Sequence, residues 1–341
     1  MERIINVPLV FVYHIYDILF SAGSVFSLTS LVCALMIAAG FVTLRHLKRR
    51  GRVRVRLLVR ALFPSHIIRH RSTKADVGYF LFNCFVYGAI FGVAAVSYQF
   101  LTNGVLRGLI AVAGPPTPST LPTAMQRSIV TLMLFLAYEL GYWIDHYLKH
   151  RVPVLWELHK VHHTAEVLTP LTNARVHPLD SLVFGHILAV TAALTNGIIA
   201  YMFGDTTYQY ALSGTNLILV AFIHLYVHLQ HTQVWIAFRG NLGRIFLSPA
   251  HHQIHHSSNP IHFNKNLGSC LAIWDWLFGT LHIPAKTREN LVFGVKPAYP
   301  DAHTITGEFV APFGRAFAVL FGWLRRRSTQ GEGRAAGDPV F

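Results

Sequence analysis

The hydrophobic positions of this chain fall into long uninterrupted blocks, not into the short alternating patterns of soluble domains. The first block, SVFSLTSLVCALMIAAGFVTL at 24–44, has no charged residue and is long enough to cross a bilayer as a helix. Further apolar blocks follow at Tyr79–Leu101, Ser128–Leu148, Leu182–Phe203 and Gln209–Gln230. The pattern predicts an all-α integral membrane protein with about five transmembrane helices, or four helices and a re-entrant pair.

The composition supports a membrane protein. Of the 341 residues, 52% are hydrophobic and only 13% are charged, against about 25% charged residues in an average soluble domain. Residues 1–23 lack the basic start and cleavage site of a signal peptide, so we expect an interfacial or re-entrant segment there. Cys33, Cys84 and Cys270 are too few and too scattered for a disulfide framework, which predicts free thiols facing a reducing compartment.

The basic residues predict the orientation in the membrane. Arg45–Lys74 holds 11 Lys and Arg and no acidic residue, so this loop is expected in the cytoplasm and the Thr102–Arg127 linker outside. Span counting then brings every histidine-rich segment to the cytoplasmic side. The net charge of +14 is explained by topology and by anionic lipid headgroups, so no nucleic acid partner is predicted. The membrane would be the inner or plasma membrane in a bacterium and the endoplasmic reticulum in a eukaryote.

Histidines form the chemical signature of the chain. Fourteen of the 21 histidines lie between His146 and His256. The spacing is HX3H at 146–150 and HX2HH at 159–163 and again at 252–256, and residues at i, i+3 and i+4 lie on neighbouring positions of a helix. So many neutral imidazoles at a membrane boundary indicate convergence on a cation. The imidazoles outnumber the roughly four ligands of a structural zinc ion, which favours two metal ions, although imidazole suits Zn, Cu, Fe and Ni alike.

The blocks around these histidines carry a family resemblance. HRVPVLWELHKVHHTAE, SPAHHQIHHS, NKNLGSCLAIWDWLFGT and the Arg-Val-His-Pro at 175–178 resemble the fatty acid hydroxylase/sterol desaturase superfamily over roughly residues 139–280. The region from His231 through Asp275 looks especially like the alkylglycerol monooxygenase branch. The resemblance implies an integral membrane enzyme with a di-iron site, which uses O2 and two external electrons to hydroxylate or desaturate a lipid.

The resemblance also implies a ligand set. It carries metal binding to nine residues: His146, His150, His159, His162, His163, His231, His252, His255 and His256. It leaves other residues as ligands or as groups supporting the ligands: His177, His228, His224, His251, Glu139, Asp180, Asp275 and Asn266. The three carboxylates could orient imidazoles, and Asn266 could contact metal-bound water or form a turn. The chain departs from the family at Tyr147, where Arg is common, and at Glu139, where Asp is common.

The remaining expectations concern partners and domains. Neither a dinucleotide fingerprint nor a haem-attachment motif occurs, so electrons should come from a separate ferredoxin or cytochrome b5 type donor with its reductase. We expect an N-terminal membrane anchor with the basic loop and external linker at 1–127 and a catalytic domain at 128–285, with a cytoplasmic histidine-lined helical cap. A cytoplasmic tail at 286–341 is expected to be partly disordered. Two alternatives are a histidine-lined metal transporter and a non-catalytic zinc-stabilised membrane scaffold.

Overall fold

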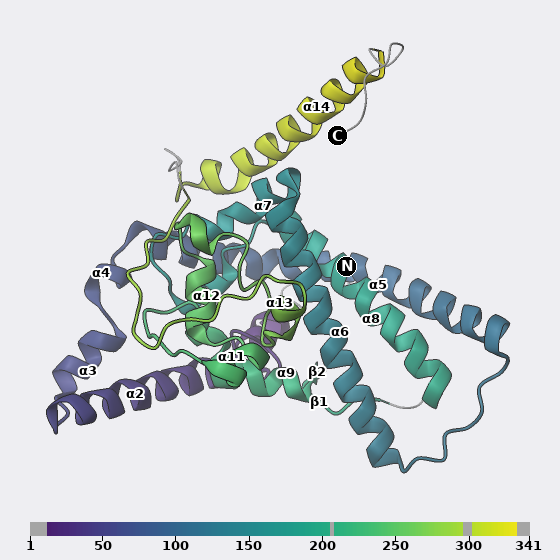
Figure 1. Cartoon of the computed structure of the whole chain (residues 1–341), viewed down its shortest axis with the longest axis horizontal. Coiled ribbons are helices and arrows are strands. Elements are labelled where there is room, and N and C mark those ends of the chain that lie inside the picture. Colours follow the sequence, from purple (N-terminus) through teal and green to yellow (C-terminus); the bar gives the residue numbers. More distant parts are fainter. Residues whose placement is uncertain (1–11, 205–207, 296–301, 333–341) are drawn as a thin grey trace, which may run out of the picture.

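The described part of the chain is mostly helical, and long helices extend from a body of shorter ones (Figure 1). A computed structural model describes residues 12–204, 208–295 and 302–332, without the side chains at 85–96 and 323–332. A helical segment at 12–20 comes first. The helices that follow are α2 (Leu28–Arg50), α3 (Val55–Leu62), α4 (Ser65–Ile68), α5 (Arg71–Ala113), α6 (Thr123–Arg151), α7 (Pro153–His163), α8 (Pro178–Phe203), α9 (Leu217–Phe222), α10 (His228–Gln230), α11 (Gly240–Ile245), α12 (Pro249–His255), α13 (Ile273–Leu277) and α14 (Ala311–Glu332). Short 3-10 helices are η1 (Pro170–Ala174) and η3 (Pro260–His262), and π-helices are η2 (Ile223–Val227) and η4 (Thr306–Val310).

Three helices in the described part of the chain, α2, α6 and α8, are long and apolar enough to cross a membrane. Helix α2 starts where the Ser27 hydroxyl accepts a hydrogen bond from the Ser30 amide, at 3.2 Å. It ends at Gly51, whose φ of 66° is the left-handed conformation that glycine favours at a helix end. The predicted Tyr79–Leu101 block lies inside the 43-residue helix α5. The count of about five spans stays a prediction.

Two predicted boundaries differ from the structure. The block at Gln209–Gln230 opens with an antiparallel hairpin of β1 (Ala211–Leu212) and β2 (Thr215–Asn216). Only Leu217–Gln230 is helical, and it counts among the shorter apolar helices, about 21 Å long at the rise of an α-helix. The linker predicted at Thr102–Arg127 is shorter, because α5 continues to Ala113 and α6 begins at Thr123. These differences arise because apolar blocks do not reveal hairpins or helix extensions.

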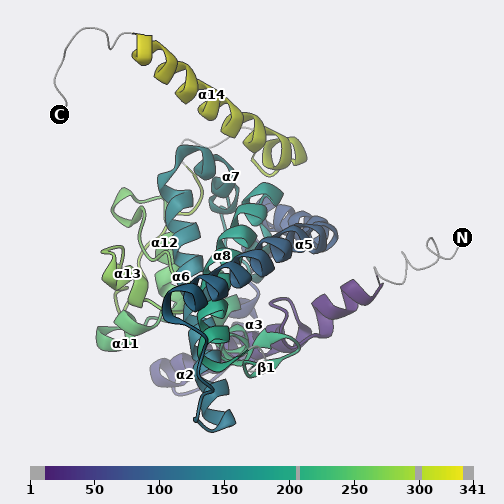
Figure 2. The same cartoon turned by 90° about the vertical axis from the view of Figure 1, so that its right-hand side faces the viewer.

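The tail predicted at 286–341 contains a long helix. Helix α14 packs against α7, and Arg315 donates to Glu157 at 3.0 Å. Both views show α14 on the outer side of α7, extending away from the body (Figure 2). The helix runs to Glu332, inside the tail that is expected to be partly disordered, and residues 333–341 lie outside the described part.

Close helix packing positions the histidines. Helices α5, α6 and α8 pack side by side, and Gly141 of α6 allows the approach, because a Cβ there would lie 2.4 Å from the Thr191 hydroxyl of α8. Small residues let apolar helices approach closely in this way. Pro153 starts α7 directly after α6 ends, a position that proline favours. The break between α6 and α7 turns the α7 histidines towards those at the end of α6.

Candidate metal centre

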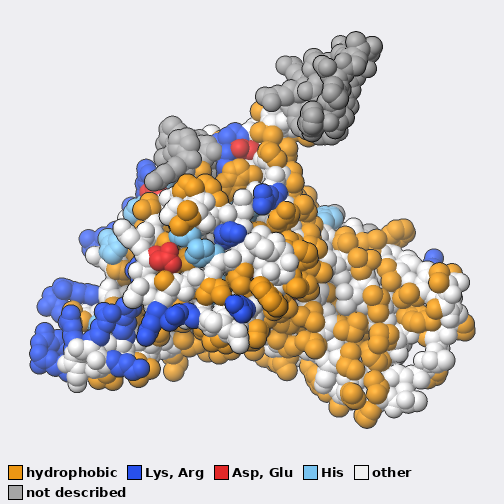
Figure 3. Space-filling view, in the orientation of Figure 1, with side chains coloured by type: hydrophobic (Ala, Val, Ile, Leu, Met, Phe, Trp, Pro, Cys, Tyr) orange, Lys and Arg blue, Asp and Glu red, His pale blue; other side chains and the backbone are white. Residues whose placement is uncertain are grey.

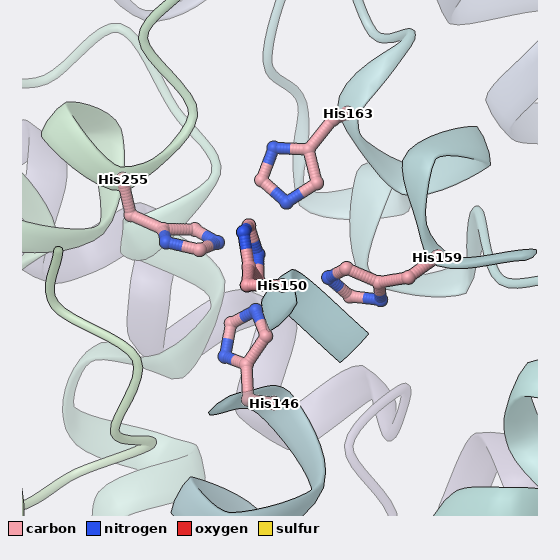
Figure 4. A group of neighbouring side chains, drawn as sticks. All are labelled: His146, His150, His159, His163 and His255. Carbon is pink, nitrogen blue, oxygen red and sulfur yellow. The ribbon is translucent and has the colours of Figure 1, made fainter. Parts of the chain in front are cut away.

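Five histidines from three helices form the first cluster: His146, His150, His159, His163 and His255. One nitrogen of each lies within 4.8 Å of the others, and Figure 4 shows the rings pointing at a common centre. Within the described residues, all five Nε2 atoms are buried and lack a hydrogen-bond partner. Buried polar atoms are rarely left unpaired in proteins, so this arrangement indicates a site for a cation.

Four further histidines form the second cluster: His162, His231, His252 and His256. Their Nε2 atoms are separated by 3.3 Å (231 to 162), 3.1 Å (231 to 256), 2.9 Å (252 to 231) and 3.1 Å (256 to 252). Nitrogens bound to one metal at about 2.0–2.1 Å would be roughly 3.0–3.4 Å apart. The spacing of the second cluster therefore fits a single transition-metal ion.

Each HX2HH box is divided between the two clusters. In α7, His159 and His163 join the first cluster and His162 joins the second; in α12 and its C-cap, His252 and His256 join the second and His255 the first. At 3.6 residues per turn, positions i and i+4 differ by about 40° around a helix, whereas i+3 lies about 100° from i+4. The boxes therefore face both clusters at once, as a pair of adjacent metal sites requires.

Backbone carbonyls and one carboxylate hold the rings. The Nδ1 atoms of His146, His162 and His255 donate to the carbonyls of Leu267, Arg175 and Lys265 at 2.8, 3.2 and 2.9 Å. Such a bond places the proton on Nδ1 and leaves the Nε2 lone pair free for a metal. His159 Nδ1 lies 3.4 Å from a carboxylate oxygen of Asp180. The other nitrogens therefore point into the clusters ready to coordinate.

Asp180 belongs to a buried triad of charged side chains, together with Lys149 and Asp145. Lys149 Nζ lies 2.7 Å from Asp145 and 3.0 Å from Asp180, and all three side chains are almost fully buried. The positive charge compensates the two carboxylates, which would be costly to bury alone. Sequence reasoning missed Asp145 and Lys149. Their i, i+4 spacing at the end of a mostly apolar block was the available signal, because charges in such a block are usually paired.

Glu139 and Asp275 hold the backbone next to the clusters. Glu139 accepts from the amides of Cys270 and Leu271 at 3.0 and 2.7 Å. Asp275 accepts from the amides of Leu267 and Gly268, both at 2.8 Å. Since the Leu267 carbonyl accepts from His146, these two carboxylates act on the cluster through the loop, whereas the sequence left open that they accept directly from imidazole N–H groups.

Asn266 also supports this loop. The side-chain Nδ2 of Asn266 donates to the carbonyls of His251 and His282, and its Oδ1 accepts from the His282 amide. Its backbone φ is 57°. The turn role considered for Asn266 is therefore the one that its contacts serve.

The other candidate histidines lie outside both clusters. His177 caps α8 through the Leu179 amide and contacts the Phe309 carbonyl at 3.0 Å. The hydroxyls of Thr29 and Ser30 lie 3.3 and 3.1 Å from His224 and His228. His251 forms a capping box with Ser248. These contacts indicate roles in helix ends and helix packing.

The clustered imidazoles are held neutral. Burial lowers the pKa of His231 and His255 to about 3. Burial and neighbouring imidazoles lower the pKa of His162, His163, His252 and His256 well below the usual value. A neutral imidazole is the form that binds metals.

A cavity of about 490 Å³ reaches the clusters. His146, His159, His162 and His231 form part of its wall, and the Asp145–Lys149–Asp180 triad forms another part. Much of the remaining wall is apolar, with Val25, Phe26, Phe80, Phe184, Leu219, Ile223 and Val227. The volume lies in the range of small-molecule sites, and the wall suits an aliphatic chain.

Comparison with known proteins agrees with this geometry. Residues 131–280 match the family model described as fatty acid hydroxylase, and this stretch contains all nine clustered histidines.

This stretch of the chain is therefore similar to a fatty acid hydroxylase domain.

Curated relatives each match about half of the chain. An ornithine lipid hydroxylase of Rhizobium tropici is 33% identical over 170 residues, which cover 50% of this chain and 45% of the relative. Alkylglycerol monooxygenases of Danio rerio and Homo sapiens are 26% and 29% identical, over 48% and 47% of this chain. The aligned residues cover only 32% of the length of each of these two monooxygenases. No solved structure matches.

Proposed function

We propose that this chain is a membrane-bound di-iron oxygenase, which uses O2 and electrons from a separate protein to hydroxylate a lipid. Desaturation of the same substrate is the less favoured outcome. The proposal rests on the observation that nine imidazoles, eight of them on buried residues, converge in two adjacent clusters beside an apolar cavity. The family match at 131–280 and the lipid hydroxylases among the relatives support the choice of chemistry.

The first cluster would hold one iron and the second cluster the other. The all-imidazole donor set suits Fe among other divalent metals, and the 2.9–3.3 Å nitrogen spacing of the second cluster fits a bound ion. Bound iron would supply activation of O2 for attack on an unactivated C–H bond. Nine clustered imidazoles exceed the four ligands of one closed zinc site, which favours a pair of metal ions.

The surrounding residues position the substrate and exclude water. An alkyl chain in the cavity would pack on Phe26, Phe80 and Phe184, with its reacting carbon near His146 and His162. The Lys149 ammonium is held by two carboxylates, so it would not recruit a second anion beside the metals. The cavity therefore favours a chain methylene over a charged headgroup at the reacting position.

The topology suggests where electrons enter. We propose that the clusters face the cytoplasm, where a ferredoxin or cytochrome b5 type donor would deliver two electrons per turnover. The apolar helices and membrane-enzyme relatives support a membrane setting.

A metal and lipid analysis tests the proposal. Purified protein should contain two irons per chain, and deletion of the gene should cause a lipid lighter by one oxygen to accumulate in aerobically grown cells. A lipid richer by two hydrogens would indicate desaturation instead. A single zinc per chain with no O2-dependent change in any lipid would overturn the oxygenase proposal.

A further inference from the structure

Helix α3 lies at the surface of the molecule, and half of its residues are exposed to solvent. It follows α2 after a turn at Gly51, and none of its residues is buried. Its half-buried positions include Leu57 and Leu58. Lys and Arg side chains gather in this region, over the end of α2 and over α3 (Figure 3).

Two exposed stripes run along this helix. The apolar stripe consists of Val55, Val59 and Phe63, which are 72%, 50% and 50% exposed. The basic stripe consists of Arg56 and Arg60 on the helix and of Arg52 in the turn before it, all exposed. Within the helix, Val55 and Val59 have the i, i+4 spacing of one helix face, and so do Arg56 and Arg60, while Phe63 is the residue that follows the last turn. An apolar stripe flanked by arginines is the composition of a helix that lies in the plane of an anionic membrane surface.

The position of α3 along the chain brings it to that surface. Helix α2 is one of the candidate membrane spans and ends in Lys48, Arg49 and Arg50. Only four residues separate Arg50 from Val55, and they span at most about 18 Å even when fully extended. If α2 crosses the bilayer, α3 must lie within the headgroup region or close to it.

We propose that α3 is an interfacial helix that binds anionic phospholipids of the cytoplasmic leaflet. The arginines of the basic stripe bind the phosphates, and the apolar stripe enters the boundary between headgroups and acyl chains. An acidic redox protein would satisfy the arginines alike, but it would leave the apolar stripe and the short tether to α2 unexplained. The combination of charge and exposed apolar side chains therefore favours lipid.

A side chain next to the second cluster holds the end of this helix. Gln233 donates from Nε2 to the carbonyls of Ala61 and Leu62 at 2.8 and 3.1 Å. These are terminal helix carbonyls, which have no partner within the helix itself. Gln233 follows His231 by two residues, so anionic lipid bound along α3 would also steady the loop that carries His231.

Hydrogen–deuterium exchange of the full chain tests the proposal. The chain is placed in lipid nanodiscs of phosphatidylcholine, with or without phosphatidylglycerol, and backbone exchange is followed in residues 52–63. A helix this short is only marginally stable without packing. Three arginines near an anionic surface should slow its exchange on the order of a hundredfold in the anionic discs, and added salt should reduce the difference.

A matched pair of variants identifies the stripe. The variant Arg52→Gln/Arg56→Gln/Arg60→Gln should lose the lipid-dependent slowing. The variant Arg239→Gln/Arg244→Gln/Arg288→Gln removes the same charge from exposed positions elsewhere and should keep it. The readout requires neither iron nor turnover, so its outcome is separate from that of the oxygenase proposal.

Three results would overturn the assignment. Equal exchange of residues 52–63 in both kinds of disc would show that α3 does not bind anionic lipid. Equal loss of the slowing in both triple variants would show an effect of net charge alone. Weaker binding of an acidic electron-transfer protein by the stripe variant, with the lipid response intact, would assign the stripe to a protein partner.

Discussion

Replacing Arg175 with Met should strongly destabilise the protein, because Arg175 is the fully buried centre of an ion network. Its guanidinium donates to Asp76 at 2.7 Å and to Glu308 at 2.7 Å, and to the Ser72 carbonyl at 2.6 Å. Arg175 and Asp76 are 0% exposed and Glu308 is 4% exposed. The network joins the start of α5 to η4, and the Arg175 carbonyl accepts from His162.

The magnitude follows from the buried charges. Met fills much of the same volume but leaves two carboxylates without their cation, and removing one partner of a buried ion pair costs about 3–5 kcal/mol. Asp76 retains hydrogen bonds from Thr169 and Thr172, which favours the lower end of that range. Adding Asp76→Asn and Glu308→Gln to Arg175→Met should restore part of the loss, because neutral amides do not need the cation.

Denaturant unfolding in detergent micelles measures this effect. The control is Arg71→Gln, which removes an exposed arginine paired with Glu166 and should change stability little, because solvent screens such pairs. The reasoning is refuted if Arg175→Met lowers the free energy of unfolding by less than about 1 kcal/mol, a value typical of surface pairs. It is also refuted if the triple variant is no more stable than Arg175→Met alone.

Four further predictions concern the metal centre. His162→Ala should lower bound metal and abolish turnover, whereas His177→Ala, outside both clusters, should retain its metal; elemental analysis of both variants decides. Asp180→Asn should weaken metal binding about ten- to a hundredfold in a chelator competition, because it removes the carboxylate behind His159, and unchanged affinity would deny that role. Stripping metal with a chelator should lower the unfolding temperature, and adding iron back should restore it. Finally, His231 and His255 have pKa values lowered from 6.5 to about 3, so the unfolded chain binds protons that the metal-free folded chain does not. The free energy of unfolding of the metal-free protein should therefore fall as the pH drops from about 6.5 towards 3, and a flat profile would contradict this.

The local part of the metal centre could be predicted from sequence. The spacing of the boxes at 146–150, 159–163 and 252–256 singled out eight of the nine clustered histidines, because helical periodicity is a local property. The resemblance supplied the ninth, His231. The division of each HX2HH box between two clusters was not predicted, because it depends on how α7 and α12 face each other across the fold.

Charged groups far apart in the chain were the harder part. Asp76, Arg175 and Glu308 come from three separate segments, and neither hydrophobic periodicity nor motif spacing links them. The π-helix at Ile223–Val227 could not be predicted either. Its hydrogen bonds join residues five apart and not four, and this difference leaves no clear signal in an apolar sequence. Asp145 and Lys149 were within reach by their i, i+4 spacing.

The shared boxes make the two clusters interdependent. Helix α7 supplies His159 and His163 to the first cluster and His162 to the second. The box at α12 supplies His255 to the first cluster and His252 and His256 to the second. A rotation of either helix would therefore displace ligands of both sites. The interior packs such helices closely, and packed helices shift between discrete positions more readily than they deform. Filling one cluster would therefore hold α7 and α12 in the orientation that the other cluster needs, so the two metal ions should bind with positive coupling. If the two ions bound independently, each site could take its ligands from separate helices, and no helix would have to supply histidines to both sites.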